Sequence, residues 1–126
     1  MRITESLKKN YEFRRLYSKG RCFGNSYLVV YSRKINSPKN RLGITVGKKI
    51  GNAVHRNRLR RRIRESYRLM EPEMQTGFEI VVVGRSRASG CDYQHIDSSL
   101  RKLLAKHGIL MEKGAEINEE DSAVAH

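Results

Sequence analysis

The spacing of hydrophobic residues near the start of the chain predicts a short helix. Phe13, Leu16 and Tyr17 recur at intervals of three and four residues, which places them on one face of a helix. Asn10 is a favourable residue for the N-cap of this helix, and Gly20 is a favourable residue for its end. We therefore expect a helix between Asn10 and Gly20.

Three later segments have patterns typical of β-strands. Residues 26–32 (SYLVVYS) are apolar or aromatic on both faces, which favours a central strand, with Tyr27 and Tyr31 on the same face. Residues 41–47 alternate apolar with small or polar side chains, and residues 78–84 (FEIVVVG) form a short apolar run. Cys22 and Phe23 predict an additional short strand. The turn-rich INSPKN between the first two segments predicts that they form an antiparallel hairpin.

Two longer helices are also expected. One follows an Asn52 cap and runs to about residue 69; its buried stripe is expected to comprise Ala53, Val54, Leu59, Ile63 and Tyr67. The other follows an Asp92 cap and ends at Gly108. Its apolar positions are Tyr93, Ile96, Leu100, Leu103 and Leu104.

This order of elements predicts an α+β fold, a small α/β sandwich whose helices pack against one sheet. The segment between Val46 and Ile80 is long enough to be a crossover between parallel strands. We expect one domain over residues 1–111, followed by an acidic, disordered tail over residues 112–126 (EKGAEINEEDSAVAH).

Charge is distributed unevenly along the chain. The net charge is +13, but residues 1–70 hold 20 Lys and Arg against 3 Asp and Glu, whereas the remainder holds 6 against 10. A basic body with an acidic end favours a polyanionic partner over a surface kept positive for solubility alone.

The densest charge is the stretch VHRNRLRRRIRE (residues 54–65), with six arginines and one acid. On a helix its basic residues form rows three and four apart, and like charges at this spacing repel one another. An ordinary solvated face would mix signs, and a disordered tail would lack an apolar stripe. The guanidinium group of arginine can also make a bidentate hydrogen-bonded contact with phosphate, which the ammonium group of lysine cannot. We therefore interpret this helix as a phosphate-binding surface, with Lys48 and Lys49 beside its N-terminus.

Other classes of site have little support in the sequence. Cys22 and Cys91 have no CxxC spacing and are expected to be reduced thiols, and the histidines lack metal-ligand spacing. No apolar run is long enough for a membrane span, and the N-terminal residues MRITESLKKN lack the apolar core of a signal peptide. A DNA-reading basic helix lacks the expected zipper or helix-turn-helix. We expect a cytoplasmic protein with no bound metal, and neither membrane nor DNA as a partner.

The segment GITVGKKIGNAVHRNRLRRRIRESYR resembles the signature of the protein subunit of bacterial ribonuclease P, a KKxGNAVxRNRxKRxxRE-like block. Matches around Phe13, Gly20, residues 41–43 and Arg85 extend the resemblance over roughly residues 5–105. That family is the basic protein cofactor of a catalytic RNA that removes the 5′ leader from precursor tRNA. In it, Mg²⁺ is required by the RNA-based holoenzyme, and the protein supplies no catalytic residue.

The resemblance also implies a fold and two sets of binding residues. The family fold has the order αβββαβα, a central four-stranded sheet and a left-handed βαβ crossover around the arginine helix. Residues matching the leader-binding cleft are Phe13, Tyr17 and Tyr31, whose rings are suited to stacking on unpaired bases. Residues matching the contact with the RNA subunit, together with one that continues an arginine row, are Lys48, Lys49, Arg56, Asn57, Arg58, Arg60, Arg61, Arg64 and Arg68.

Two alternatives from other classes stay open. A ribosomal or general RNA-chaperone protein would have a similar composition but no preference for leader-bearing tRNA. A self-sufficient nuclease would need His55 and Glu65 to act together, yet ten residues of helix separate them by about 15 Å of rise.

Overall fold

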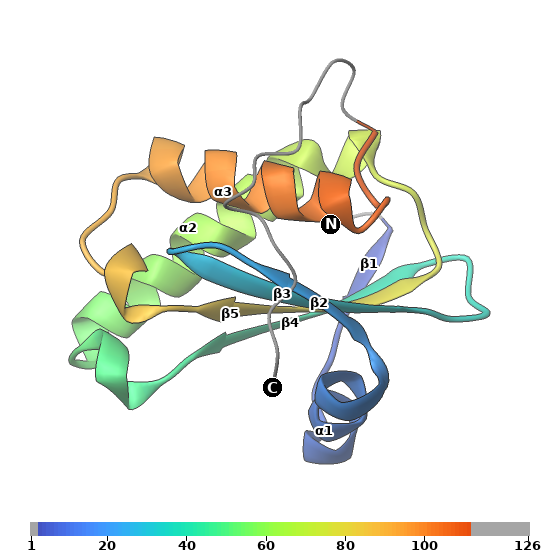
Figure 1. The fold of residues 1–126 in the computed structure, drawn as a ribbon, viewed down its shortest axis with the longest axis horizontal. Helices are drawn as coiled ribbons and strands as arrows, with labels where there is room; N and C mark the ends of the chain where they lie inside the picture. The colour runs from blue at the N-terminus through green and yellow to red at the C-terminus, as the bar shows by residue number, and fades with distance from the viewer. Residues whose placement is uncertain (1–2, 112–126) are drawn as a thin grey trace.

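The computed structural model describes residues 3–111, which form five strands and three α-helices in a single α+β domain (Figure 1). The predicted tail, residues 112–126, lies outside the described residues. The strands are β1 (Thr4–Ser6), β2 (Arg21–Gly24), β3 (Leu28–Lys34), β4 (Asn40–Val46) and β5 (Phe78–Gly84). The α-helices are α1 (Asn10–Lys19), α2 (Ala53–Met70) and α3 (Tyr93–Lys106), and short 3₁₀ turns lie at Lys48–Ile50, Glu71–Glu73 and Ser86–Ala88.

The strands form one sheet in the order β1-β4-β5-β3-β2. β5 lies at its centre, parallel to β4 and antiparallel to β3. The expected hairpin between β3 and β4 is therefore wrong, because β5 is inserted between them. The expected parallel crossover, in which α2 joins β4 to β5, is confirmed; its handedness stays a prediction.

The sheet has five strands rather than the expected four. The additional strand, β1, pairs in parallel with the outer edge of β4, with Thr4 opposite Asn40 and Ser6 opposite Leu42. Its three residues, TES, carry no hydrophobic alternation, so no pattern in the sequence marks them as a strand. The backbone of β4 holds this segment in place, together with hydrogen bonds between the Thr4 side chain and those of Tyr67 and Glu71.

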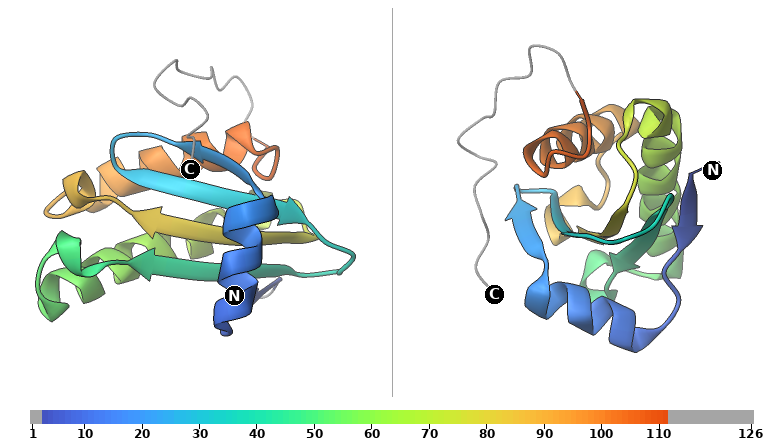
Figure 2. Two further views of the ribbon diagram at one scale, coloured as in Figure 1. Left: turned by 60° about the horizontal axis from the view of Figure 1, so that its bottom comes forward. Right: turned by 90° about the vertical axis from the view of Figure 1, so that its right-hand side faces the viewer.

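The helices cover the two faces of the sheet unequally (Figure 2). α2 and α3 pack side by side on one face and enclose the main core with it, whereas α1 crosses the other face alone over a smaller cluster. The expected stripe on α2 is confirmed at Leu59, Ile63 and Tyr67, each at most 2% exposed. Ala53 and Val54 are wrong, since both are exposed. Val54 is 63% exposed because it lies nine residues, or two and a half turns, before Ile63, which is the opposite face of the helix.

Two of the three expected helix caps are confirmed. The side chains of Asn52 and Asp92 accept hydrogen bonds from backbone N–H groups three residues later, at 3.0 Å in each case. Asn10 is wrong as a cap, since it is the first residue of α1 and Lys9 precedes it as the cap. The Glu12 carboxylate accepts the Lys9 backbone N–H at 3.2 Å, which fixes the helix start one residue earlier.

A buried histidine joins the end of α3 to the sheet. The Nε2 of His107 lies 2.8 Å from the Val30 carbonyl oxygen and therefore donates to it, and Nδ1 accepts the Ser32 hydroxyl at 2.5 Å. Burial lowers the pKa of His107 to about 4, and the nearby Arg21 acts in the same direction against the opposing hydrogen bond to Val30. The imidazole is therefore neutral at pH 7 and serves as a structural bridge.

No helix within residues 3–111 is both long and apolar enough to cross a membrane.

Candidate nucleic-acid interface

The basic residues of α2 divide into groups according to what each guanidinium contacts. Arg56 donates to the Gly51 carbonyl at 3.2 Å, and Arg60 donates to the Val46 carbonyl at 3.4 Å and to the Asn57 side chain at 3.2 Å. Arg62 donates to the Cys91 carbonyl in the segment before α3. These three arginines therefore help to fix the entry to the crossover and the start of α3.

Arg68 differs from the other predicted arginines because its charge is already paired. Its guanidinium makes two hydrogen bonds to the Glu65 carboxylate, at 2.6 and 3.2 Å. This ion pair lowers the pKa of Glu65 and raises the pKa of Arg68. Glu65 thus neutralises one arginine and leaves the others on the exposed face unpaired.

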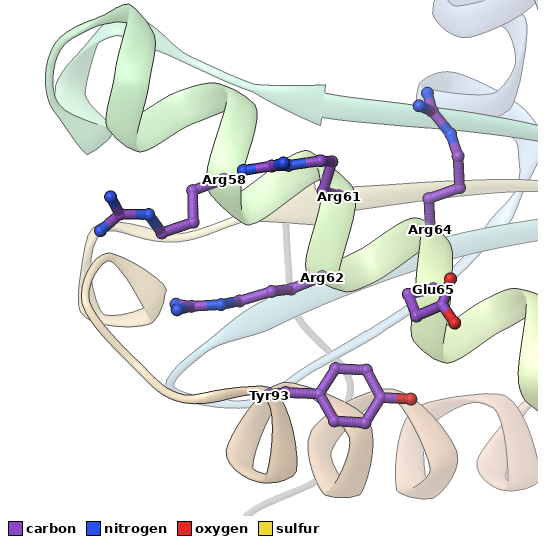
Figure 3. Close-up of a pocket in the computed structure, with 6 residues that line it drawn as sticks. All are labelled: Arg58, Arg61, Arg62, Arg64, Glu65 and Tyr93. Atoms are coloured by element: carbon purple, nitrogen blue, oxygen red, sulfur yellow. The ribbon is translucent and has the colours of Figure 1, made fainter.

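Arg58, Arg61 and Arg64 are exposed and have no hydrogen bond or ion pair with any residue among 3–111. Together with Arg62, Glu65 and Tyr93 they line an open pocket of ≈ 490 Å³ between α2 and α3, which we name the arginine pocket (Figure 3). Three unpaired guanidiniums on one rigid helix are suited to binding successive phosphates. Lys48 and Lys49 are exposed in the 3₁₀ turn before α2 and extend the basic surface beyond the start of the helix.

The three predicted aromatics lie together on the opposite face of the sheet, beside α1. Tyr17 and Tyr31 meet edge to face with ring centroids 4.8 Å apart, and Tyr17 also hydrogen-bonds Thr45 at 3.3 Å between the hydroxyl oxygens. All three rings are half-buried against Leu7, Leu16 and Val81. Burial raises the pKa of Tyr31 to about 12, with Cys22 and Tyr17 adding to the rise, so its hydroxyl stays protonated.

The position of the Phe13 ring depends on the absence of a side chain at a neighbouring glycine. A Cβ built on Gly43 of β4 would lie 2.5 Å from Phe13 Cε1, so the ring packs directly on the strand backbone. On its other side Phe13 lines a pocket of ≈ 490 Å³, which we name the aromatic cleft. The other lining residues of this cleft are Asn10, Arg14, Tyr17 and Thr45.

A buried ion cluster fastens α1 to the sheet next to the aromatic cleft. Glu79 of β5 is 1% exposed, and it pairs with Arg15 of α1 and Arg33 of β3 at 3.1 Å each and with Arg41 of β4 at 3.5 Å. Arg41 also contacts the buried Glu12. Burial alone would raise the pKa of Glu12, but the Lys9 backbone and Arg41 hold it below its ordinary value. This cluster fixes the helix that carries Phe13 and Tyr17.

A smaller pocket of ≈ 170 Å³ lies between the two surfaces. It is lined by Phe13 on one side and Arg64 on the other, with residues of β1 and β4 between them. Arg64 therefore lines both this pocket and the arginine pocket, and Phe13 lines both this pocket and the aromatic cleft. The two predicted surfaces lie on opposite faces of the sheet, but each shares a lining residue with the smaller pocket between them.

Several residues of these surfaces were not predicted. Thr45 alternates with Leu42, Ile44 and Val46, so its place on the aromatic face could have been predicted from strand periodicity. Tyr93 was expected to be a core position of α3, but it lines the arginine pocket instead. Glu79 could have been singled out from the sequence, because a charged residue within an apolar strand needs buried partners.

Within residues 3–111, no three His, Cys, Asp or Glu side chains are grouped as ligands for a metal ion.

Comparison with known proteins gives a consistent result. The Ribonuclease P family profile matches residues 1–108. Ribonuclease P protein components from Lachnoclostridium phytofermentans and Thermoanaerobacter are 44% and 43% identical to the chain over 108 and 100 residues, covering 86% and 79% of this chain and 93% and 86% of theirs.

Solved structures agree with the sequence comparison. The ribonuclease P protein from Staphylococcus aureus has a TM-score of 0.75 at 35% identity and covers 84% of this chain and 97% of its own. The protein from Thermotoga maritima has a TM-score of 0.75 at 34% identity and covers 81% and 96%. The α+β sandwich, the arginine helix and the matching profile all lead to one conclusion: the chain belongs to the Ribonuclease P family of protein components.

Proposed function

We propose that this chain is the non-catalytic subunit of a ribonuclease P ribonucleoprotein that matures the 5′ end of tRNA. In this proposal the exposed face of α2, with Lys48 and Lys49, binds the catalytic RNA, and the aromatic cleft binds the 5′ leader of precursor tRNA. The observation that carries the proposal is the set of unpaired guanidiniums of Arg58, Arg61 and Arg64 inside the family's signature block.

The aromatic cleft supplies the complementary chemistry. Unpaired bases stack on aromatic rings for roughly 1–3 kcal/mol each, irrespective of sequence, and a leader is such a single strand. Phe13 and Tyr17 line the cleft and Tyr31 adjoins Tyr17, while the exposed Arg14 can reach the backbone phosphates. We assign the reaction's magnesium to the RNA, and no residue among 3–111 is given a role in the chemical step.

The test is cleavage of precursor tRNA at low magnesium by the ribonuclease P RNA subunit, with and without this protein. We expect the protein to restore cleavage and to favour substrates with a leader of several nucleotides over those with one. Phe13→Ala should abolish the preference for the longer leader without abolishing binding to the RNA subunit. Tyr11→Ala is the matched control, since Tyr11 is an aromatic residue of the same helix that is 54% exposed and outside the cleft.

No stimulation by the wild-type protein would refute the proposal. Stimulation of annealing or folding of many RNAs, with equal affinity for leader-bearing and mature tRNA, would favour a general RNA chaperone instead.

A further inference from the structure

Tyr93 occupies an unusual position for an aromatic residue of an amphipathic helix. It is the first residue of α3 and only half-buried, whereas Ile96, Leu100 and Leu103 of the same helix are fully buried. Burial and the neighbouring Asp97 and Glu65 raise its pKa, against the opposing influence of Ser66 of α2 and of Arg101. The ring lies at the start of α3 and borders the arginine pocket between α2 and α3 (Figure 3).

The charge around this ring is strongly positive. Arg58, Arg61 and Arg62 extend together toward the start of α2, and Arg64 extends to the other side of the helix (Figure 3). Arg62 is held by the Cys91 carbonyl, which ties the segment before Tyr93 to α2. Glu65, the only carboxylate among the described residues that line the pocket, is neutralised by its two hydrogen bonds to Arg68.

An aromatic ring beside unpaired guanidiniums is suited to a ligand that has both a flat base and phosphates. We propose that the arginine pocket binds one unpaired nucleotide of the RNA subunit, with its base stacked on Tyr93 and its flanking phosphates held by Arg58 and Arg61. This inference rests on the proposed function and extends it, because Tyr93 lies outside the arginine signature and makes the contact one of base stacking as well as charge.

Two properties of the pocket favour an unpaired nucleotide within a polymer. In a duplex the faces of the bases are stacked on one another, so Tyr93 could reach a base only where the strand is unpaired. The pocket is also open to solvent, whereas small-molecule sites bury most of their ligand. A nucleotide held by the rest of a folded RNA does not need such enclosure.

The chain contains no tryptophan, which allows a direct test of stacking. Tyr93→Trp places a single indole at the pocket, and a base stacked on it should quench its fluorescence when the RNA subunit is added to saturation. Tyr11→Trp on the outer face of α1 is the matched control and should keep its emission. Unchanged emission of Tyr93→Trp at saturating RNA would overturn the inference.

Affinity provides an independent readout. Tyr93→Leu should weaken binding of the RNA subunit by about 5- to 150-fold, the loss of one stacked base, with the slope of log K against log salt unchanged because no phosphate contact is lost. Tyr93→Phe keeps the ring and should bind within about twofold of wild type. A loss in Tyr93→Phe equal to that in Tyr93→Leu would overturn the stacking role.

Thermal unfolding of each variant identifies any loss that comes from misfolding. If the wild-type chain fails to bind the RNA subunit at all, the proposed function fails. If the wild-type chain binds and Tyr93→Leu binds equally well, only the nucleotide site fails.

Discussion

Two clusters of three arginines, on opposite faces of the same sheet, differ in what surrounds them. Arg15, Arg33 and Arg41 converge on the buried carboxylate of Glu79, and Arg41 also contacts Glu12. Arg58, Arg61 and Arg64 line an open pocket and have no partner among residues 3–111. In the first cluster the arginines serve the fold, because their charge is used to attach α1. In the second the charge is left available for an anion from outside the chain.

The comparison shows that the number of arginines in a cluster does not predict whether their charge is available for an external anion. The two clusters differ in where their acidic residues lie. Glu79 and Glu12 are buried among the arginines of the first cluster, whereas Glu65, beside the second cluster, is already paired with Arg68. The following substitutions test this distinction in order of their expected effect on the free energy of unfolding.

Glu79→Gln should destabilise the protein most. It leaves three guanidiniums facing one another without their shared carboxylate, although each is about one-third exposed and can recover some hydration. We expect the free energy of unfolding in urea to fall by roughly 2–4 kcal/mol. Glu5→Gln, which removes an exposed partner of Lys39, is the control and should change it by less than about 0.5 kcal/mol. A loss below about 1 kcal/mol in Glu79→Gln would mean that the cluster is not structural.

His107 extends the test to a group that burial keeps uncharged. Its pKa is about 4 in the folded protein against 6.5 ordinarily, so the unfolded chain binds the extra proton between these values. Stability from this group is complete above pH 6.5 and is lost as the pH falls toward 4. Between pH 7 and pH 4.5 we expect a loss of roughly 2–3 kcal/mol in urea unfolding, and His107→Gln should remove that part of the pH dependence. An equal pH dependence in both proteins would contradict this assignment.

Gly43→Ala tests how the aromatic cleft is held. The new methyl group would lie 2.5 Å from the Phe13 ring, which must move off β4. We expect the free energy of unfolding to fall by about 1–2 kcal/mol, together with a weaker preference for leader-bearing substrate in the cleavage assay. Gly47→Ala is the control for stability, since a Cβ there meets no atom within 4 Å. Unchanged leader preference in Gly43→Ala would show that the packing of Phe13 on Gly43 is not needed for leader binding.

The triple replacement of Arg58, Arg61 and Arg64 by Ala should affect folding least. Because these side chains repel one another and have no partners among residues 3–111, unfolding stability should be unchanged or slightly higher. The slope of log K against log salt for the RNA subunit should fall by about 2–3, at roughly 0.7–0.9 per lost phosphate contact. Replacing Lys19, Lys34 and Lys102 by Ala removes the same charge from elsewhere and should leave the slope nearly unchanged. Equal slopes for the two triple variants would show that charge alone, and not this surface, governs binding.

The sequence predicted most of the elements but not their arrangement. α2, α3 and β5 could be found because periodicity and capping residues are local signals, and both the Asn52 and Asp92 caps are confirmed. The pairing of β5 between β3 and β4 is non-local, so the expectation of a simple hairpin was wrong. β1 was missed because its pairing depends on backbone contacts with β4 rather than on an apolar pattern.

The residues of the candidate binding surfaces could likewise be predicted from the sequence only in part. The structure brings Phe13, Tyr17 and Tyr31 together, and it groups Arg58, Arg61 and Arg64 in one pocket. Sequence spacing alone could not separate these arginines from Arg56, Arg60 and Arg62, whose guanidiniums donate to the backbone carbonyls of Gly51, Val46 and Cys91. Sequence spacing also placed Tyr93 among the buried positions of α3. Helical spacing does not show which of these positions the neighbouring helix leaves uncovered.

The position of Arg64 has a thermodynamic consequence. Its side chain lines the arginine pocket and also the smaller pocket that Phe13 shares with the aromatic cleft. If occupation of one pocket reorients this guanidinium, the free energies of binding at the two surfaces are not additive. Linkage then requires reciprocity: the RNA subunit changes the affinity for the leader by the same factor as the leader changes the affinity for the RNA subunit. One arginine would thereby give substrate binding and subunit assembly a common coupling energy.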